Sequence, residues 1–169
     1  DQVCAAGIGR TFQIVKPFAG LTVLDNVVVG ALQRTPGVPA ARALAAQVLQ
    51  RLGLADRSEH LASTLTLPDR KRLEVARALA TQPRLLLLDE VMAGLRPTEC
   101  DQMVDVLRDL NARDGVTILL IEHVMRAVMA LAQHIVVLHH GQIVARGSPE
   151  QVVRDPAVLE CYLGEDAEV

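Results

Sequence analysis

The stretch that most constrains the fold of this chain is the apolar run Leu85–Leu88, which ends abruptly in Asp89 and Glu90. It lies between Gln82-Pro83 and Ala93-Gly94, which are both typical of turns. A short apolar run bounded in this way predicts a strand that is buried on both faces, as in parallel sheets covered by helices. Ligands bind at the carboxyl ends of such strands, so the two acids are expected at a ligand-binding edge.

The acid pair has two possible explanations. Its carboxylates can simply face solvent at the end of a core strand, or they can serve a nucleoside triphosphatase, which uses such acids to hold Mg²⁺ and to orient the attacking water. A second apolar run, Val116–Ile121, ends in the same way at Glu122 and His123. Two helix-linked strands of this kind predict a parallel pair whose polar ends converge on one site. A lone histidine after a strand is also common as a cap or a surface residue.

Composition narrows the class of protein. With 169 residues, half of them apolar, the chain has the size of one globular domain. A formal net charge of −3 argues against a nucleic-acid-binding surface, which needs clustered positive charge. Cys4, Cys100 and Cys161 are odd in number and lack a metal-like spacing, so we expect free thiols in a reducing cytosol. No signal peptide is visible, and no apolar run reaches the roughly 20 residues that span a bilayer.

Helical periodicity follows several turn signals. We expect helices from Thr22 to about Leu32, over 40–52, after the segment 65–69 to about Ala80, from Pro97 onward and over 125–132. The inward stripes are Leu73, Ala76 and Leu79 or Ala80 in the third helix and Cys100, Met103, Val104, Leu107 and Leu110 in the fourth. Residues 1–9 show no pattern of a helix or a strand.

The third predicted helix begins with a recognisable cap. Thr66 and Asp69 have the Thr-x-x-Asp spacing of a capping box, and Pro68 is tolerated in a first turn. Arg70 and Glu74 are expected to form an outward ion pair at i and i+4.

The end of the chain predicts a hairpin followed by short helices. Runs 135–138 and 143–147 flank a glycine-containing turn, and Ser148 can cap a helix that reaches about Val153. A further helix is expected over 156–163. The neighbouring His139 and His140 would point to opposite faces of a strand end, so no metal site is predicted there.

The order of the motifs resembles that of ATP-binding cassette (ABC) ATPases. Gln13 follows Arg-Thr-Phe, a helical insert and the segment 65–80 come next, and Asp89-Glu90, Gly94-Leu95 and His123 complete the series. The resemblance runs from about residue 7 to 163. Gly147-Ser148-Pro149-Glu150 and Tyr162-Leu163-Gly164 are most similar to the ATP-binding subunits of bacterial branched-chain amino acid importers, with urea or short-amide importers next.

This resemblance implies an α/β fold of the P-loop NTPase type, with a mostly parallel sheet flanked by helices and a small helical insert. It also implies four segments. They are the glutamine-loop segment 1–32, the helical subdomain and signature segment 33–68, the remaining ATPase core 69–147, and the C-terminal helices and tail 148–169.

The resemblance also implies a role for each motif residue. The cofactors would be ATP and Mg²⁺. Asp89 would bind Mg²⁺, Glu90 would be the catalytic base, and His123 would hydrogen-bond the γ-phosphate. Gln13 would contact the metal and the attacking water and, with the residues after it, sense the membrane subunits. Taken alone, Gln13 could equally be an ordinary loop amide.

The chain departs from the family pattern in its signature segment. Thr66 and Asp69 occupy positions that would contact the nucleotide bound on a partner subunit, and Pro68 stands where the family has glycine. Proline removes an N–H donor, and the charge of Asp69 opposes phosphate binding at the helix start. We therefore expect one weakened composite site in a heterodimer. The loop 93–96 would make the dimer contact, although Arg96 replaces its usual acid or asparagine.

A second departure concerns the phosphate loop. No Gly-x-x-x-x-Gly-Lys-Ser/Thr motif occurs, and Lys16 and Lys71 lie in other contexts. In the family this loop precedes the glutamine, so the sequence is interpreted as truncated at its N-terminus. The chain alone is expected to bind ATP very weakly and not to hydrolyse it.

The leading interpretation is the ATPase subunit of an importer. Its partners would be transmembrane permease subunits and a second ATPase subunit, identical or different, at the cytoplasmic face of the inner membrane. One alternative, an ATPase of chromosome maintenance or DNA repair, would need long coiled coils where 33–64 has room for a short helix. Another is a non-catalytic fragment that acts only as an interaction module. The transported solute stays open.

Overall fold

The computed structural model describes residues 2–13 and 16–165. Its chain divides into two compact units, Asp1–Ala127 and Val128–Val169. The predicted helices and strands recur in both units, with differences reported below. The division into the four functional segments 1–32, 33–68, 69–147 and 148–169 remains a prediction.

The larger unit is organised around a parallel sheet with the strand order β1-β2-β3. These strands are β1 (Ile8–Arg10), β2 (Leu85–Asp89) and β3 (Thr117–Ile121). In the register, Leu87 of β2 pairs with Arg10 on one side and with Leu119 on the other. The predicted parallel pair is therefore confirmed. Strand β1 and the short helix α1 (Gln2–Ala5) lie where no pattern was found.

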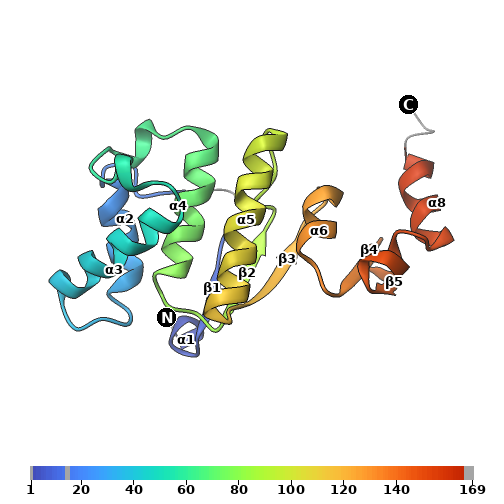
Figure 1. Ribbon diagram of the computed structural model, residues 1–169, viewed down its shortest axis with the longest axis horizontal. Coiled ribbons are helices and arrows are strands. Elements are labelled where there is room, and N and C mark those ends of the chain that lie inside the picture. Colours follow the sequence, from blue (N-terminus) through green and yellow to red (C-terminus); the bar gives the residue numbers. More distant parts are fainter. Residues whose placement is uncertain (1, 14–15, 166–169) are drawn as a thin grey trace. The chain divides into compact units, whose positions relative to one another are not determined.

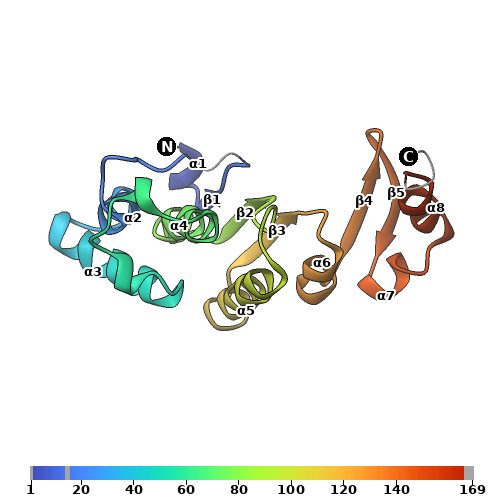
Figure 2. The same cartoon turned by 90° about the horizontal axis from the view of Figure 1, so that it is seen from above.

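One face of the sheet is covered by helix and the other is open around β3. Figure 2 shows helix α5 (Pro97–Asp114) on one side of β2 and β3. Leu86 and Leu88 of β2 are buried, whereas Leu119 and Ile121 of β3 are 58% and 61% exposed. Alternate strand residues point to opposite faces, so these side chains of β3 point away from the covered face. The prediction that the strands are buried on both faces is wrong here.

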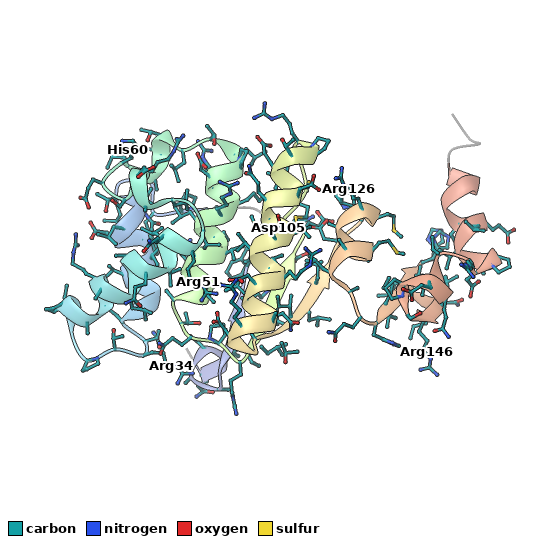
Figure 3. All side chains as sticks on the ribbon, in the orientation of Figure 1. Arg34, Arg51, His60, Asp105, Arg126 and Arg146 are labelled. Atoms are coloured by element: carbon teal, nitrogen blue, oxygen red, sulfur yellow. The ribbon has the colours of Figure 1, made fainter. Side chains whose placement is uncertain are left out.

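Three helices pack together beside the sheet, as Figure 1 shows. They are α2 (Val23–Ala31), α3 (Val38–Arg51) and α4 (Leu67–Leu79), joined through the short 3₁₀ turns η1 (Ala55–Arg57) and η2 (Ala62–Thr64). The hydroxyl of Thr22 accepts a hydrogen bond from the Asp25 N–H at 3.0 Å, which confirms the predicted cap. Arg51 of α3 forms ion pairs with Asp109 and Asp114 of α5 (Figure 3). These ion pairs link the helical insert to the helix that covers the sheet.

The predicted inward faces of the helices are confirmed. Leu73, Ala76 and Leu79 of α4 are buried, as are the five predicted residues of α5. The outward ion pair is wrong, because Glu74 is buried and bonds to Arg77, while Arg70 donates to the Leu65 carbonyl. Glu74 thereby lies beside Phe12 and Gln13.

The smaller unit has its own apolar cluster. Strand β4 (Ile135–His139) pairs antiparallel with β5 (Gln142–Gly147), and α7 (Pro149–Val152) and α8 (Pro156–Glu165) follow. Helix α6 (Met125–Leu131) contains the boundary between the units. The buried members of the cluster are Ile135, Ala145, Val152 and Val158. The predicted hairpin and the Ser148 cap are confirmed.

Two further expectations concern the whole of the described chain. Cys4, Cys100 and Cys161 are free, as predicted. Within residues 2–13 and 16–165, no helix combines the length and the apolar character that crossing a membrane requires.

Candidate functional site

Three of the predicted site residues meet at the carboxyl ends of the strands. The side-chain amide of Gln13 donates a hydrogen bond from Nε2 to Glu90 Oε2 at 2.8 Å. His123 Nδ1 lies 3.9 Å from the other carboxylate oxygen, Glu90 Oε1. The parallel register of β2 and β3 brings Glu90 and His123 together, because each follows the end of its strand. Glu90 therefore lies between an amide and an imidazole.

The backbone of Glu90 is held in an unusual conformation. Its φ of +48° lies in the left-handed region, which costs a residue other than glycine roughly 1–3 kcal/mol. Its N–H donates to the Ile121 carbonyl at 2.9 Å, and its own carbonyl accepts a hydrogen bond from Lys71 Nζ at 2.8 Å. These bonds on both sides of the residue hold the turn that directs its carboxylate.

Asp89 is fixed by the segment that precedes Gln13. Its backbone N–H donates to the hydroxyl of Thr11 at 3.1 Å, and its carboxylate lies 3.8 Å from the guanidinium of Arg10. Arg10 is 58% exposed, so solvent weakens this ion pair. The N–H of Thr11 donates to the Leu87 carbonyl and continues the ladder between β1 and β2. Asp89 and Gln13 therefore lie at the same edge of the sheet.

The oxygen atoms at this edge of the sheet are suitable ligands for Mg²⁺. Among residues 2–13 and 16–165, no three His, Cys, Asp or Glu side chains are grouped closely enough to enclose a metal. Mg²⁺ does not require such a group, since it is usually held by one or two carboxylates together with substrate phosphates and water. The Asp89 carboxylate and the side-chain oxygen of Gln13 are oxygen ligands of the kind that Mg²⁺ prefers.

Two hollows adjoin these residues. One, of about 110 Å³, is lined by Arg10, Leu87, Leu88, Asp89, Leu119 and Ile121 on the open face of the sheet. The other, of about 440 Å³, lies beside Gln13 and is lined by Phe12, Gln13, Lys16, Glu74 and Arg77. The smaller hollow thus adjoins Asp89 and the larger one adjoins Gln13.

Thr66 and Asp69 lie elsewhere, at the start of α4. The Thr66 hydroxyl donates to Asp69 Oδ2 at 2.8 Å, and the same carboxylate oxygen lies 3.2 Å from Arg57 Nη1. The hydroxyl makes no hydrogen bond to a helix N–H, so the capping-box prediction is wrong although Thr66 is the N-cap residue. Both residues are thus engaged at the start of α4 and not at the acid pair.

An ion pair between Arg96 and Glu99 joins the end of the loop to the first turn of α5. Arg96 is the N-cap residue, and its backbone N–H and guanidinium both donate to the carboxylate of Glu99. Hydrogen bonds from Arg96 hold the pKa of the Glu99 carboxyl below its usual value. Arg96 therefore stabilises the start of α5.

Sequence reasoning missed several residues of the site. Arg10 and Thr11 adjoin Gln13, so their position beside it was the signal that could have found them. The sequence context of Lys71 excludes it from a phosphate loop and suggests no other role. The i,i+4 spacing with Arg70 predicts that Glu74 lies on the outer face of its helix, whereas it is buried. No local pattern indicates that Lys71 binds the Glu90 carbonyl or that Glu74 lies beside Phe12, because these neighbours belong to distant segments.

Glu74 is the titratable group with the clearest perturbation near the site. Burial raises the pKa of its carboxyl, while the Arg77 guanidinium, 3.0 Å away, and the backbone N–H of Phe12 act in the opposite direction. Burial dominates because the side chain is only 6% exposed.

This shift predicts a pH dependence of stability. The folded state binds the Glu74 proton more tightly than the unfolded state does, so the stabilisation is complete below pH 4.5 and is lost as the pH rises through the higher folded pKa. Relative to a Glu74→Gln variant, the unmodified protein should therefore lose unfolding free energy as the pH rises from 4.5 toward neutrality. Urea unfolding of both proteins across this range measures the difference. A difference that grows in favour of the unmodified protein would contradict the assignment.

Comparisons with known proteins match this chain to a family. Residues 2–93 match the sequence profile of the ABC transporter family, and residues 142–168 match that of the branched-chain amino acid ATP-binding cassette transporter. The chain is 38% identical over 180 aligned positions to the high-affinity branched-chain amino acid transport ATP-binding protein LivG of Escherichia coli K12. This alignment covers 98% of the chain and 71% of that protein.

Two further relatives extend the comparison. The transport ATP-binding protein BraF of Pseudomonas aeruginosa is 37% identical, with 97% of this chain and 70% of that protein covered. The crystal structure of the ADP conformation of MJ1267, an ATP-binding cassette of an ABC transporter, superposes with a TM-score of 0.82 at 29% identity. That superposition covers 96% of this chain and 70% of MJ1267.

The chain belongs to the ABC transporter family and has the fold of its ATP-binding cassettes. Within that family it is similar to LivG and BraF, which are named for branched-chain amino acid transport. The predicted resemblance and the predicted α/β fold are thereby confirmed.

Proposed function

We propose that this chain is part of the ATP-hydrolysing subunit of an importer for branched-chain amino acids. The observation that carries the proposal is the cluster in which Gln13 and His123 flank the Glu90 carboxylate. The names of LivG and BraF and the matching C-terminal profile support the choice of solute. An importer that takes up another small solute is the nearest alternative.

Each residue of the cluster has a role that its chemistry supports. Glu90 is the general base that orients and deprotonates the attacking water, because its carboxylate lies at the exposed strand end and is oriented by Gln13. His123 is 64% exposed and can donate a hydrogen bond to the terminal phosphate. Asp89 and Gln13 would hold Mg²⁺, which when bound neutralises charge on the phosphate oxygens.

Thr66 and Asp69 have a different proposed role. In the assembled transporter they would face the nucleotide bound by a second ATPase subunit. Asp69 brings a negative charge to the start of α4, and Arg57 offsets only part of it at 3.2 Å. Pro68 contributes no N–H donor. We therefore expect a heterodimer in which this segment serves the partner's nucleotide poorly.

The proposed partners are permease subunits and a second ATPase subunit, and not nucleic acid. Contact with the permease would involve the segment after Gln13 and the helical insert. Residues 14 and 15 of that segment lie outside the described residues. The proposed location is the cytoplasmic face of the inner membrane, where the subunit would be peripheral.

The transport proposal predicts a specific uptake. The full-length protein, reconstituted in vesicles with its permease and second ATPase subunit, should drive ATP-dependent accumulation of leucine, isoleucine or valine. Excess urea should compete poorly with labelled leucine. A His123→Ala complex, which lacks the proposed phosphate contact, should lose uptake and is the matched control.

Two results would contradict this proposal. Uptake of urea in preference to leucine would assign another solute. Nucleotide-dependent assembly without any hydrolysis would favour the interaction module.

A further inference from the structure

Besides Asp69, helix α4 buries two charged residues, Lys71 and Glu74, which lie three positions apart. Lys71 is 6% exposed and Glu74 is 5% exposed. A buried charge is costly unless hydrogen bonds or an opposite charge compensate it. Lys71 binds one of the two segments that form the Glu90 site, whereas Glu74 binds Arg77 of the same helix and lies beside the other segment.

Lys71 contacts the turn that carries the base. Its ammonium group donates to the Glu90 carbonyl at 2.8 Å, and the Ala93 N–H donates to the same oxygen at 3.3 Å. Glu90 has a left-handed backbone, so an interaction with its carbonyl helps to hold a conformation that the residue would otherwise leave. Lys71 thereby acts on the direction of the Glu90 side chain.

Glu74 contacts the segment that carries the amide. It lines the same hollow as Phe12 and Gln13, with its carboxylate beside the backbone N–H of Phe12, the residue directly before Gln13. It also binds Arg77, whose guanidinium donates to the Lys16 carbonyl at 3.3 Å and stacks 4.8 Å from the centre of the Phe18 ring. Glu74 and Arg77 therefore hold the Gln13 segment on both of its sides.

We infer that Lys71 and Glu74 are positioning residues that set the hydrogen bond between Gln13 and Glu90. Lys71 holds the backbone of one member of that 2.8 Å hydrogen bond, and Glu74 lies beside the other member and binds Arg77, which holds the Lys16 carbonyl. Both side chains extend from the same helix. The inference rests on the proposed function, because the bond matters only if Glu90 is the base.

Packing alone does not account for this pair of charges. Helix α4 already buries Leu73, Ala76 and Leu79 in the core. Apolar side chains at positions 71 and 74 would fill the same space without the cost of removing two charges from water. The polar contacts of Lys71 and Glu74 are directional and can fix the orientation of the neighbouring backbone. Hydrophobic contacts are not directional and fix that orientation less well.

The test uses the full-length complex and separates positioning from folding. Lys71→Met and Glu74→Leu remove the contacts, whereas Lys71→Arg and Glu74→Gln keep a donor and an acceptor. The first two should lower kcat by about tenfold to a hundredfold while the KM for ATP changes by less than about twofold, because misplacing the base affects the reacting geometry. The two conservative variants should recover most of the rate.

Additional variants provide the controls. Arg113→Met removes a charge that is 79% exposed and should leave kcat unchanged. In a Glu90→Gln background, Lys71→Met should cause no further loss, because both changes act through the same carboxylate. If Lys71→Met does not fold, as judged by thermal melting, Glu74→Leu and the milder Lys71→Gln decide the question.

Different results would refute the proposed function and the positioning role of Lys71 and Glu74. Hydrolysis that survives Glu90→Gln would refute the proposed function. A large loss with Glu90→Gln but an unchanged kcat in folded Lys71→Met and Glu74→Leu proteins would refute the positioning inference alone. A raised KM with an unchanged kcat would also refute the inference.

Discussion

Replacing Glu90 by glutamine is expected to abolish most ATP hydrolysis by the full-length complex. Glutamine keeps the size of the side chain and can still contact Gln13, but it cannot accept a proton from the attacking water. General-base catalysis typically contributes about 10²–10⁴-fold to a rate, so kcat should fall by a factor in that range. Phosphate release at saturating ATP measures the effect, and thermal melting should show that the fold is retained.

Asp69→Gln provides the contrast to this variant. It also replaces a carboxylate by an amide, but at the start of α4, where Asp69 contacts Thr66 and Arg57 and not the base. Removing a negative charge from this helix start should not lower hydrolysis. If Asp69→Gln proved more damaging than Glu90→Gln, the assignment of Glu90 as the base would be wrong.

Gly30→Val is expected to destabilise the folded protein most among the glycine substitutions in helices. Gly30 lies within α2, where a Cβ atom would come 2.5 Å from the backbone carbonyl oxygen of Arg77 in α4. A backbone atom cannot move aside like the end of a side chain, so the two helices must separate. Overpacking of this kind costs about 1–3 kcal/mol. At about 2–4 °C per kcal/mol, the melting temperature should fall by several degrees.

Gly20→Val is the matched control for that substitution. No atom lies within 4 Å of a Cβ atom built at Gly20, and its φ is not in the left-handed region. Its unfolding free energy should therefore stay within about 0.5 kcal/mol of the unmodified value. Equal destabilisation by the two substitutions would show that the close approach of α2 and α4 is not what disfavours a side chain at position 30.

Helix α4 connects these predictions. Its inward face packs against α2 and the core, and Thr66 and Asp69 lie at its start. Lys71 binds the Glu90 carbonyl, and Glu74 lies beside the Gln13 segment. Changes that displace this helix should therefore affect stability and catalysis together. Changes confined to Glu90 should affect catalysis alone.

Much of the fold follows from local patterns in the sequence. The apolar run before Asp89 identified β2, and the same pattern before Glu122 identified β3. The stripes of α4 and α5 were right residue by residue, because helical periodicity reports which face is buried. The parallel rule then brought Glu90 and His123 to one edge, as the register confirms.

Other features depend on contacts between distant segments, which local patterns do not encode. Strand β1 has three residues and no periodicity of its own, and it exists because its backbone pairs with β2. The same limit applies to the charged side chains of α4. The spacing of Arg70 and Glu74 suggested an outward pair, but the rotation of the helix against the core turns Glu74 inward to Phe12 and Arg77.

The residues themselves specify the elements, the buried stripes and the chemistry at the strand ends, since these depend on neighbours along the chain. Only the folded arrangement shows that Lys71 binds the Glu90 carbonyl, that Asp69 is paired with Arg57, and that β3 leaves one face open. Such contacts depend on sheet register, helix rotation and turn geometry, which are set by the packing of the whole unit.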